Sequence, residues 1–485
     1  MKSLLYFILT VFTVVALTSA ATFTSIHKQL RDYTVFNTVL SQKEGRLDLH
    51  TDLANIESHF SNLRSELQTE KSLLEQYKLY SSALSKIECG HTQVHINKPI
   101  LREWLMERNS LPIDYYLIGK RLVVNKLVSN DAAIVNGGKS SDQRSRKIKA
   151  GSEIISIDHK TVSEMMEGIG KYISSDENSM DFKYFQAAQM FAFFRHLDSP
   201  FTEDSIHVRY VDGVDTNQVY LFTGTAPVNS MNHRLRKNAQ SYTDNEFNMG
   251  QFKIVKSEYA YFRFKSFSTS SGKNYEAFLL KSFKKIKTKH IDKLVVDLRG
   301  NTGGVMQYSF MKYLVGPDVV LGRYVVEKPK TRINSKLVQK MNIHFLRHSL
   351  MSQQQERKKR RGLFDNGTIR TEDVDTNYLY DGQIVVITDE GTFSSAAILA
   401  CHLKTLSNAK IVGRTPGGSF YAGNAGTLIV KLPQSGIKLS VNPNTFYSHL
   451  EMTDNPTEIK QPDLDLNPLI IDKKKTRINI TLSKR

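Results

Sequence analysis

The chain has 485 residues, which is long enough for two or three domains with hydrophobic cores of their own. Its formal net charge is +18, and part of the excess lies in two basic tracts, residues 355–364 and 471–477. Only two cysteines occur, Cys89 and Cys401, which excludes a scaffold held together by disulfides. They could pair if the fold brought them together, but we expect two buried thiols.

The N-terminus has the pattern of a secretory signal. Lys2 precedes the uncharged run "LLYFILTVFTVVAL", and "TSA" before Ala21 supplies the small residues that a signal peptidase needs. We therefore expect residues 1–20 to be removed and the mature chain to be secreted or periplasmic. No second long apolar stretch follows, so no membrane span is expected. Export also argues against nucleic acid as a partner. We interpret the basic tracts as solvated surface, with attraction to an acidic surface or substrate as the alternative.

The first part of the mature chain, residues 21–100, is expected to form a helical segment. Leu and Phe recur at helical spacing in "LANIESHFSNLRSEL" and "KSLLEQYKLYSSALSKI", and the pattern ends at "ECGHTQVHI". Residues 111–213 carry short strands and a helical extension. Within them, "AGSEIISIDHKTVSEMM" predicts a glycine turn, a strand, a second turn and an amphipathic helix.

Strands alternate with helical patterns over residues 250–470, which predicts a layered α/β core. The predicted strands include "YAYFRFKSF", "KLVVDLRGNTGG", "QIVVIT" and "AKIVGR". Two of these strands run directly into turns whose composition suggests chemistry.

The first of these turns, in "VVDLRGNTGG", places three glycines and Asn301 directly after an apolar strand. Glycines let a backbone approach a ligand closely, and successive N–H groups can bind an anion. The GxGxxG spacing of dinucleotide-binding turns is absent, and so is the Gly-Lys-Ser/Thr of a P-loop. An ordinary strand-to-helix turn would account for one or two of the glycines.

The second turn, in "DEGTFSSAAILACHL" (residues 389–403), places Ser394 and Ser395 in front of an apolar helix. Serine is favoured at helix N-caps, which is one explanation. A strand, a tight turn and a serine at a helix N-terminus are also the means by which a chain exposes a nucleophile to a positive helix end.

Together the two turns resemble those of the S41 family of serine peptidases, the carboxy-terminal-processing or tail-specific proteases. The family's Asp-x-Arg-x-Asn-x-Gly-Gly motif is matched at residues 297–304, and its nucleophile falls on Ser394. "AGSEIISIDHKTV" resembles part of the family's PDZ-type domain, and "QPDLDL" resembles its closing motif at Pro462 and Asp463. The resemblance covers nearly the whole mature chain. It implies a crotonase-like (ClpP-like) spiral α/β core with an N-terminal helical segment and an inserted PDZ-like domain.

The general base is where the sequence departs from one branch of this family. The Ser-Lys branch carries a lysine after the serine where this chain has Ser419, and Lys404 and Lys410 are poor substitutes. "ECGHTQV" resembles an element of the histidine-type, tricorn-like branch, which implies that His91 is the base. An imidazole near its ordinary pKa suits this task at neutral pH.

A third group should orient the imidazole. The resemblance implies an acid just before Pro462, where Glu451, Asp454 and Glu458 all lie, and we expect Glu458. A Ser-His dyad steadied by the backbone or by Thr92 is the alternative.

An acyl-transfer site also needs backbone N–H groups for the oxyanion. Ser395 N–H and the N–H of Gly303 or Gly304 are the expected donors, and the Ser395 hydroxyl is expected to cap the helix.

We therefore expect an exported serine endopeptidase that hydrolyses peptide bonds in proteins or peptides through an acyl-enzyme on Ser394. No metal or organic cofactor is implied. In the family, the PDZ-like domain takes up a peptide by strand addition, and the insertion at residues 136–147 falls in this region. Because the lysine is missing, a catalytically inactive S41-like protein that binds an apolar ligand or a peptide is the alternative, and a peptide-binding scaffold is a third class.

Overall fold

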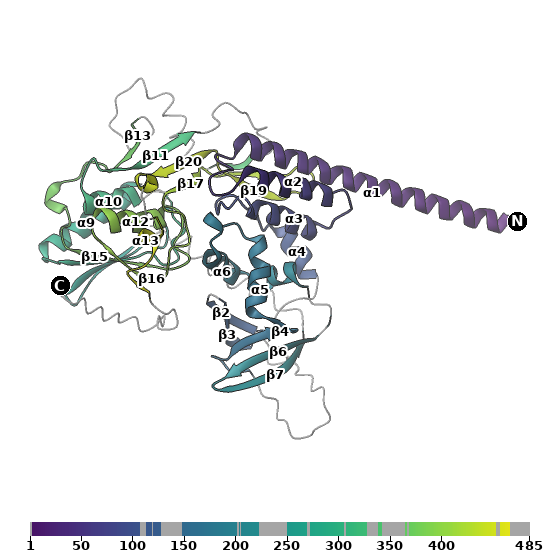
Figure 1. Ribbon diagram of the computed structural model, residues 1–485, viewed down its shortest axis with the longest axis horizontal. Coiled ribbons are helices and arrows are strands. Elements are labelled where there is room, and N and C mark those ends of the chain that lie inside the picture. The colour runs from purple at the N-terminus through teal and green to yellow at the C-terminus, as the bar shows by residue number, and fades with distance from the viewer. Residues whose placement is uncertain are drawn as a thin grey trace. The chain divides into compact units, whose positions relative to one another are not determined.

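The computed structural model consists of two compact units (Figure 1). The first comprises Met1–Asn238, Gly322–Ile369 and Ala422–Tyr447, and the second comprises Ala239–Leu321, Arg370–Tyr421 and Ser448–Arg485. The residues described are 2–106, 113–118, 120–127, 148–200, 203, 205–222, 250–268, 272–304, 307–326, 338–341, 364–365, 368–452 and 456–465.

The first unit begins with a helical segment, where the spacing of Leu and Phe in the sequence predicts helices. Its helices are α1 (Lys2–Lys43), α2 (Leu53–Glu66), α3 (Leu73–Ser85) and α4 (Lys98–Met106). Helix α3 starts at a capping box formed by Ser72 and Glu75. The buried ring of Phe36 packs against Phe60 and Tyr80, with ring centroids 5.1 and 5.0 Å apart. Aromatic packing of this kind joins the helices into one core.

An antiparallel sheet with the order β2–β3–β4–β6–β7 follows, and β5 pairs with β4. Its strands are β2 (Ile113–Ile118), β3 (Arg121–Leu127), β4 (Glu153–Ile157), β5 (Lys160–Thr161), β6 (Ser205–Asp212) and β7 (Asp215–Phe222). The helical elements between them are α5 (Val162–Ile169), η1 (Gly170–Tyr172), η2 (Asp176–Asn178), α6 (Met180–Gln189) and α7 (Phe191–Asp198). The strand and helix predicted from "AGSEIISIDHKTVSEMM" are β4 and α5, and the predicted turn between them lies at residues 158–159. The two-residue strand β5 follows this turn, and a capping box of Thr161 and Glu164 starts the helix.

Two further sheets contain strands from distant parts of the sequence. One has the order β1–β19–β18–β12, and the other has the order β13–β14–β11–β20–β17. Their strands are β1 (Val94–His95), β11 (Val320–Val326), β12 (Val338–Met341), β13 (Phe364–Asp365), β14 (Thr368–Arg370), β17 (Ala422–Ala425), β18 (Leu428–Lys431), β19 (Lys438–Val441) and β20 (Asn444–Ser448). Because β19 pairs with β1, part of the range that the sequence pattern assigns to the 250–470 core lies in the first unit.

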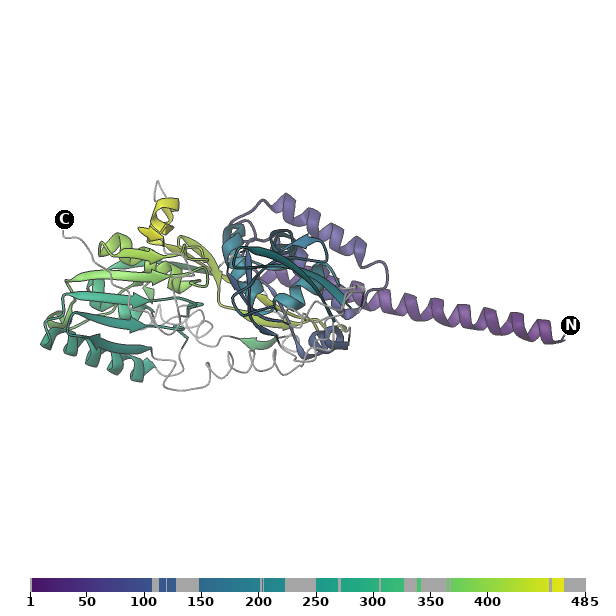
Figure 2. The same ribbon diagram turned by 90° about the horizontal axis from the view of Figure 1, so that it is seen from below.

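The second unit is built on a six-stranded sheet with the order β21–β16–β15–β10–β9–β8, seen from a second side in Figure 2. The strands are β8 (Gln251–Val255), β9 (Tyr259–Arg263), β10 (Lys293–Asp297), β15 (Gln383–Thr388), β16 (Lys410–Gly413) and β21 (Leu464–Asp465). From β9 to β21 each neighbouring pair is parallel, and β8 is antiparallel to β9.

The helical elements of the second unit are α9 (Gly272–Thr288), α10 (Gln307–Val315), η3 (Thr376–Tyr378), α12 (Ser395–Leu406), η4 (His449–Met452) and α13 (Pro456–Lys460). Helix α10 packs against both α9 and α12. Strands and helices therefore alternate, and the mixed α/β fold predicted from the sequence is confirmed.

Strand β10 lies in the interior of the sheet and in the hydrophobic core of the second unit. Leu294, Val295 and Val296 are all buried, as expected for a parallel strand that is covered on both faces. On the next strand, the ring of Phe262 packs against Phe310 with centroids 5.2 Å apart.

Some sequence predictions lie outside the described residues. These are the insertion at 136–147, residues 355–363 of the first basic tract, the second basic tract at 471–477, and Asp454, one of the acids considered with Glu458. Among the residues that the structure describes, no helix is both long and apolar enough to cross a membrane. Cys89 and Cys401 are buried thiols and form no disulfide, as expected.

Candidate active site

Two turns meet at the carboxyl ends of β10 and β15. These strands are parallel neighbours, so the chain leaves both at the same edge of the sheet. The Gly300 amide donates to Asp389 Oδ1 at 2.8 Å, and the Phe393 amide donates to the Asn301 carbonyl at 2.9 Å. The sheet therefore joins the two motifs of the sequence into one structure. We call residues 389–395 the nucleophile turn.

Ser394 stands where the nucleophile turn enters α12. Its φ is 55° and its ψ is −133°, a conformation that costs a residue other than glycine about 1–3 kcal/mol. It makes no side-chain cap bond at the start of the helix. A serine on a strained strand-to-helix turn has the geometry of a nucleophile elbow. The N-cap explanation therefore does not account for this residue.

The neighbouring Ser395 does not cap the helix either. Its hydroxyl is buried and has no hydrogen-bond partner among the described residues. The expected cap by Ser395 is wrong, because this residue is already the first residue of α12 and its side chain lies in the packed interior.

Two glycines leave the space that Ser394 occupies. A Cβ on Gly303 would lie 2.8 Å from Ser394 Cβ, and a Cβ on Gly418 would lie 2.5 Å from the Ser394 nitrogen. Gly303 also has a φ of 92°, which favours glycine. Gly418 lies in the loop after β16, where the Gly417 amide donates to the Thr392 carbonyl at 2.9 Å. The backbone of Ser394 is therefore enclosed by glycines from two different loops.

The three amides predicted as oxyanion donors lie in this region but differ in their partners. The Ser395 nitrogen faces Gly303, because a Cβ on that glycine would lie 3.0 Å from it. The Gly303 amide donates to Asn301 Oδ1 at 2.8 Å, so this amide already has an acceptor. Gly304 has a φ of 142° and lies against the Phe267 carbonyl. The amides of Ser395 and Gly304 are therefore the better candidates.

Asp297 and Arg299 of the first motif hold the shape of its turn. Arg299 donates from Nε to Asp297 Oδ1 at 2.9 Å and from its terminal nitrogen to Oδ2 at 2.6 Å. The Tyr261 hydroxyl donates to Oδ2 at 2.7 Å. Burial by itself would raise the pKa of Asp297, but the hydrogen bonds and charge of Arg299 outweigh it and lower that pKa. This carboxylate is fully buried and ion-paired, so it serves structure rather than proton transfer.

Asp389 connects the two turns through its carboxylate. Its Oδ1 accepts from the Gly300 amide at 2.8 Å and from the Gly391 amide at 3.1 Å. Burial, the largest influence, raises the pKa of Asp389 to about 6 although these hydrogen bonds oppose it. The nucleophile turn therefore contains one carboxyl group that titrates near neutrality.

The lysines that follow the nucleophile are placed away from it. Lys404 lies near the end of α12, about 15 Å along the helix from Ser394 at 1.5 Å per residue. Its Nζ donates to the Glu458 carbonyl at 3.2 Å. Lys410 begins β16, at the opposite edge of the sheet from the nucleophile turn, and pairs with Asp463 at 3.8 Å. Neither lysine is in a position to serve as the base.

Two residues of the second unit bear on the lysine that the Ser-Lys branch uses as its base. Ser419 is buried directly after Gly418, which contacts the Ser394 backbone. Lys265 follows β9, whose carboxyl end lies beside that of β10, and sequence reasoning missed it. Burial and then the charge of Arg263 lower the pKa of Lys265. Lys265 is therefore the competing candidate for the general base.

His91 lies in the first unit, in the loop of residues 86–93 between α3 and β1, which we call the histidine loop. The Gly90 amide donates to Asp176 Oδ1 at 2.8 Å, and the Thr92 hydroxyl donates to Glu44 Oε1 at 2.6 Å. Burial lowers the pKa of His91 below its ordinary 6.5, although the charge of Asp176 opposes this shift. The imidazole is therefore neutral at neutral pH, which is the form that a general base needs.

Glu44 is a fully buried carboxylate that anchors the histidine loop. In addition to the Thr92 hydroxyl, it accepts from Asn424 Nδ2 at 2.9 Å and from the Asn442 amide at 3.0 Å. Burial raises the pKa of Glu44 to about 7, and the hydrogen bonds oppose this shift.

Asp176 is the carboxylate that the structure brings to His91, and sequence reasoning missed it. Donor atoms of Cys89, His91 and Asp176 all lie within 4.8 Å of one another. Asp176 begins η2, and the next residue, Glu177, has a φ of 53°. Nothing in the sequence "SSDENSM" links this turn to the histidine loop, because the two are joined only in the folded unit.

Glu458, the acid expected from the sequence, lies elsewhere. Its side chain is exposed on α13, and its carbonyl accepts from Lys404 near the end of α12. Ser394 stands just before the opposite end of that helix, so the structure does not bring Glu458 to Ser394. The neighbouring Asp463 exchanges two hydrogen bonds with the backbone of Ile411, both of 2.8 Å, and precedes the edge strand β21. The closing Pro-Asp motif therefore completes the sheet.

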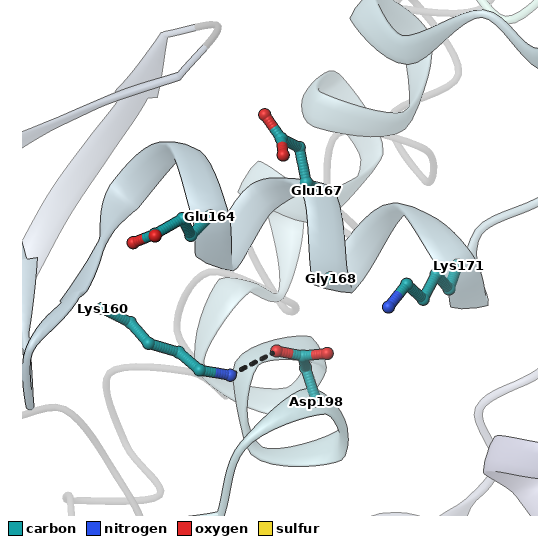
Figure 3. A pocket seen from close by; sticks show the side chains of 6 residues that line it. All are labelled: Lys160, Glu164, Glu167, Gly168, Lys171 and Asp198. Atoms are coloured by element: carbon teal, nitrogen blue, oxygen red, sulfur yellow. Dashed lines mark hydrogen bonds and ion pairs between the residues drawn. The ribbon is translucent and has the colours of Figure 1, made fainter.

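A separate surface hollow lies on the first unit beside α5 (Figure 3). It is lined by charged side chains, and Lys160 points toward Asp198 with 3.4 Å between Nζ and Oδ2. Gly168 leaves room for this carboxylate, because a Cβ there would collide with it. The hollow contains opposite charges that pair with each other, so it offers no match to an apolar ligand.

Residues 258–453 match the model of peptidase family S41. These residues form a serine-peptidase domain of family S41. The match contains the turn at 297–304 and Ser394, and the histidine loop lies outside it. Its position agrees with the resemblance that the two motifs indicate.

Three solved structures align with most of this chain. Mature CPAF complexed with lactacystin is 12% identical over 91% of this chain and 94% of that chain, with a TM-score of 0.56. The photosystem II D1 C-terminal processing protease is 14% identical over 92% and 94%, with a TM-score of 0.40. The tricorn protease is 15% identical over 90% and 34%, with a TM-score of 0.32. At these identities the CPAF likeness shows the fold alone. No curated protein is significantly similar in sequence.

Proposed function

We propose that the chain is an exported serine endopeptidase that cleaves peptide bonds in proteins or peptides with Ser394 as nucleophile. The observation that carries this proposal is the backbone of Ser394, which is held in a strained conformation at the start of α12. Such strain persists only where the surroundings enforce it, and it concentrates at catalytic sites. Here Gly303 and Gly418 provide the close contacts that enforce it.

The proposed reaction proceeds in two halves. Ser394 Oγ attacks the carbonyl carbon of the peptide bond while a base accepts the hydroxyl proton. The amides of Ser395 and Gly304, with the positive N-terminus of α12, stabilise the oxyanion. The C–N bond then breaks as the protonated base gives its proton to the leaving amine. Water attacks the acyl-enzyme in the second half, the base accepts its proton, and Ser394 is regenerated.

His91 is the proposed base. Its support is the resemblance of "GHT" to the histidine-type branch and a pKa that keeps the imidazole neutral above about pH 6.5. Asp176, within 4.8 Å of it, is the proposed positioning residue in place of Glu458. His91 belongs to the first unit and Ser394 to the second, and a general base must come within hydrogen-bond distance of the proton that it accepts.

Three further assignments belong to the proposal. The second unit is taken as a crotonase-like core. The sheet β2–β7 with α5 is taken as a PDZ-like domain, which would bind an extended substrate segment by strand addition. Residues 1–20 are taken as a cleaved signal, so the mature enzyme would act in the periplasm or outside the cell.

An inactive protein that binds an apolar ligand is the weaker proposal. The strained backbone of Ser394 lowers the stability of the fold, and a protein that only binds a ligand would gain nothing from it. The hollow beside α5 is lined by charged rather than apolar side chains.

A fluorophosphonate probe tests the proposal, because it labels only an activated serine. The mature chain should be labelled and should digest an unstructured protein, and Ser394→Ala should remove both properties by roughly 10³-fold or more. Ser395→Ala is the matched control, because it keeps the backbone amide and should retain most activity. Labelling of a different residue, or more than a few per cent of activity in Ser394→Ala, would refute the assignment.

A further inference from the structure

The histidine loop contains a set of donor atoms that the proposed reaction does not explain. Cys89, His91 and Asp176 offer a thiol sulfur, an imidazole nitrogen and a carboxylate oxygen, all within 4.8 Å of one another. Of the residues that the structure describes, these form the one group of three such side chains able to reach a common ion. Peptide hydrolysis needs the histidine and a carboxylate, but it has no use for the cysteine.

The chemistry of the three donors selects the ion. Thiolate and imidazole favour zinc over magnesium or calcium, which prefer oxygen ligands alone. Three protein ligands and a water complete the tetrahedral arrangement that zinc adopts. In a bound tetrahedron the donor atoms are less than 4 Å apart, so closure needs movements of about 1 Å from the spacing seen here.

Burial and hydrogen bonding hold the three donor residues in place, as expected for a preformed metal site. Cys89 is buried, Asp176 is buried and held by the Gly90 amide at 2.8 Å, and His91 is half-buried. Zinc binds the thiolate form of cysteine, so binding displaces the thiol proton into solvent.

We propose that Cys89, His91 and Asp176 form an inhibitory zinc site that switches off the general base. A neutral imidazole has one ring nitrogen with a lone pair and one that carries a proton, and a general base uses the lone pair. Zinc at either nitrogen occupies the lone pair and leaves the other nitrogen protonated. Zinc and proton transfer therefore exclude each other at His91. The regulatory half of this inference rests on the proposed role of His91, whereas the binding half does not.

Cobalt tests the binding half without any measurement of activity. The full-length mature chain, freed of metal by a chelator, is titrated with Co²⁺, and zinc is then added to displace it. A thiolate-to-cobalt charge-transfer band should appear, should be absent from Cys89→Ser, and should persist in Cys401→Ser, which removes a buried thiol of the other unit. No such band in the wild-type protein, or an unchanged band in Cys89→Ser, overturns the site.

The regulatory half is tested on the same proteins with fluorophosphonate labelling and peptide hydrolysis. Zinc should inhibit both in the wild type, and a chelator should restore them. Measured against its own zinc-free activity, Cys89→Ser should need at least about tenfold more zinc for the same fractional inhibition, since even an outer-shell partner of a metal site contributes 10- to 100-fold. A cobalt band with labelling that zinc leaves unchanged overturns the switch. If Ser394 never labels, the proposed function fails while the band still decides the site.

Discussion

The nucleophile turn and the histidine loop are held in place by different kinds of contact. The nucleophile turn is fixed by residues of the two motifs themselves, such as Gly300 with Asp389, which follow adjacent strands of one sheet. The histidine loop is fixed by Glu44 and Asp176, which belong to other elements of the first unit. A local motif can therefore reveal the first region, whereas the second depends on tertiary contacts.

The largest effect is expected from removal of the proposed base. His91→Ala should lower kcat/KM by roughly 10³-fold or more, because the serine hydroxyl then loses its proton acceptor. In the wild type, kcat/KM should rise with pH through an acid limb below pH 6.5, since burial lowers the pKa of His91 and the neutral imidazole is the active form. A pH–rate series measures both.

The lysine variants are the controls for this prediction. Lys404→Ala and Lys410→Ala should stay near wild-type activity, as should Lys265→Ala. A loss of activity in Lys265→Ala alone would assign the general base to the second unit. The histidine loop would then have no catalytic role.

Gly303→Ala should damage the nucleophile turn next most severely. The new Cβ would lie 2.8 Å from Ser394 Cβ, at a φ of 92° that alanine rarely adopts. Displacement of the nucleophile or of the Ser395 amide should reduce kcat by about 10²-fold, comparable to loss of one oxyanion donor. Gly423→Ala is the matched control, because its Cβ would enter open space. Equal kinetics for the two variants would contradict the tight enclosure of Ser394.

Glu44, which anchors the histidine loop, should make the free energy of unfolding depend on pH. Glu44 has a pKa of about 7 when folded, against an ordinary value of 4.5, so the folded state binds more protons between these values. Its contribution is complete below about pH 4.5 and is lost as pH rises through 7, a difference of roughly 3 kcal/mol in the free energy of unfolding. Urea unfolding at pH 5 and pH 8 should show a larger decrease for the wild type than for Glu44→Gln. Parallel decreases in the two proteins would assign the dependence to other groups.

The smallest effect separates the two candidate acids. Asp176→Asn should lower kcat about 10- to 100-fold, and it should move the acid limb to lower pH because the charge of Asp176 raises the pKa of His91. Glu458→Gln should change neither quantity, as this side chain is exposed on α13. The reverse result would restore the acid expected from the sequence.

The elements and the nucleophile turn could be predicted because their signals are local. Helical spacing revealed α2 and α3, and alternation revealed β4. Gly303, one of the glycines that enclose Ser394, stands within the first motif. The acid beside His91 could not be predicted, because its closeness depends on how η2 packs against the loop after α3. Similarly, the pairing of β19 with β1 assigns residues 438–441 to the first unit, although their sequence continues the pattern of the second.

The φ of 55° at Ser394 has a consequence for evolution in this chain. A conformation that disfavours every side chain but suits glycine means that the nucleophile is kept at the expense of fold stability. The free energy of unfolding of Ser394→Gly should therefore exceed those of the wild type and Ser394→Ala by about 1 kcal/mol, because the strain is relieved. Thermal unfolding should show this as a higher midpoint temperature. Selection for stability alone would replace this serine, whereas selection for the proposed activity would keep it.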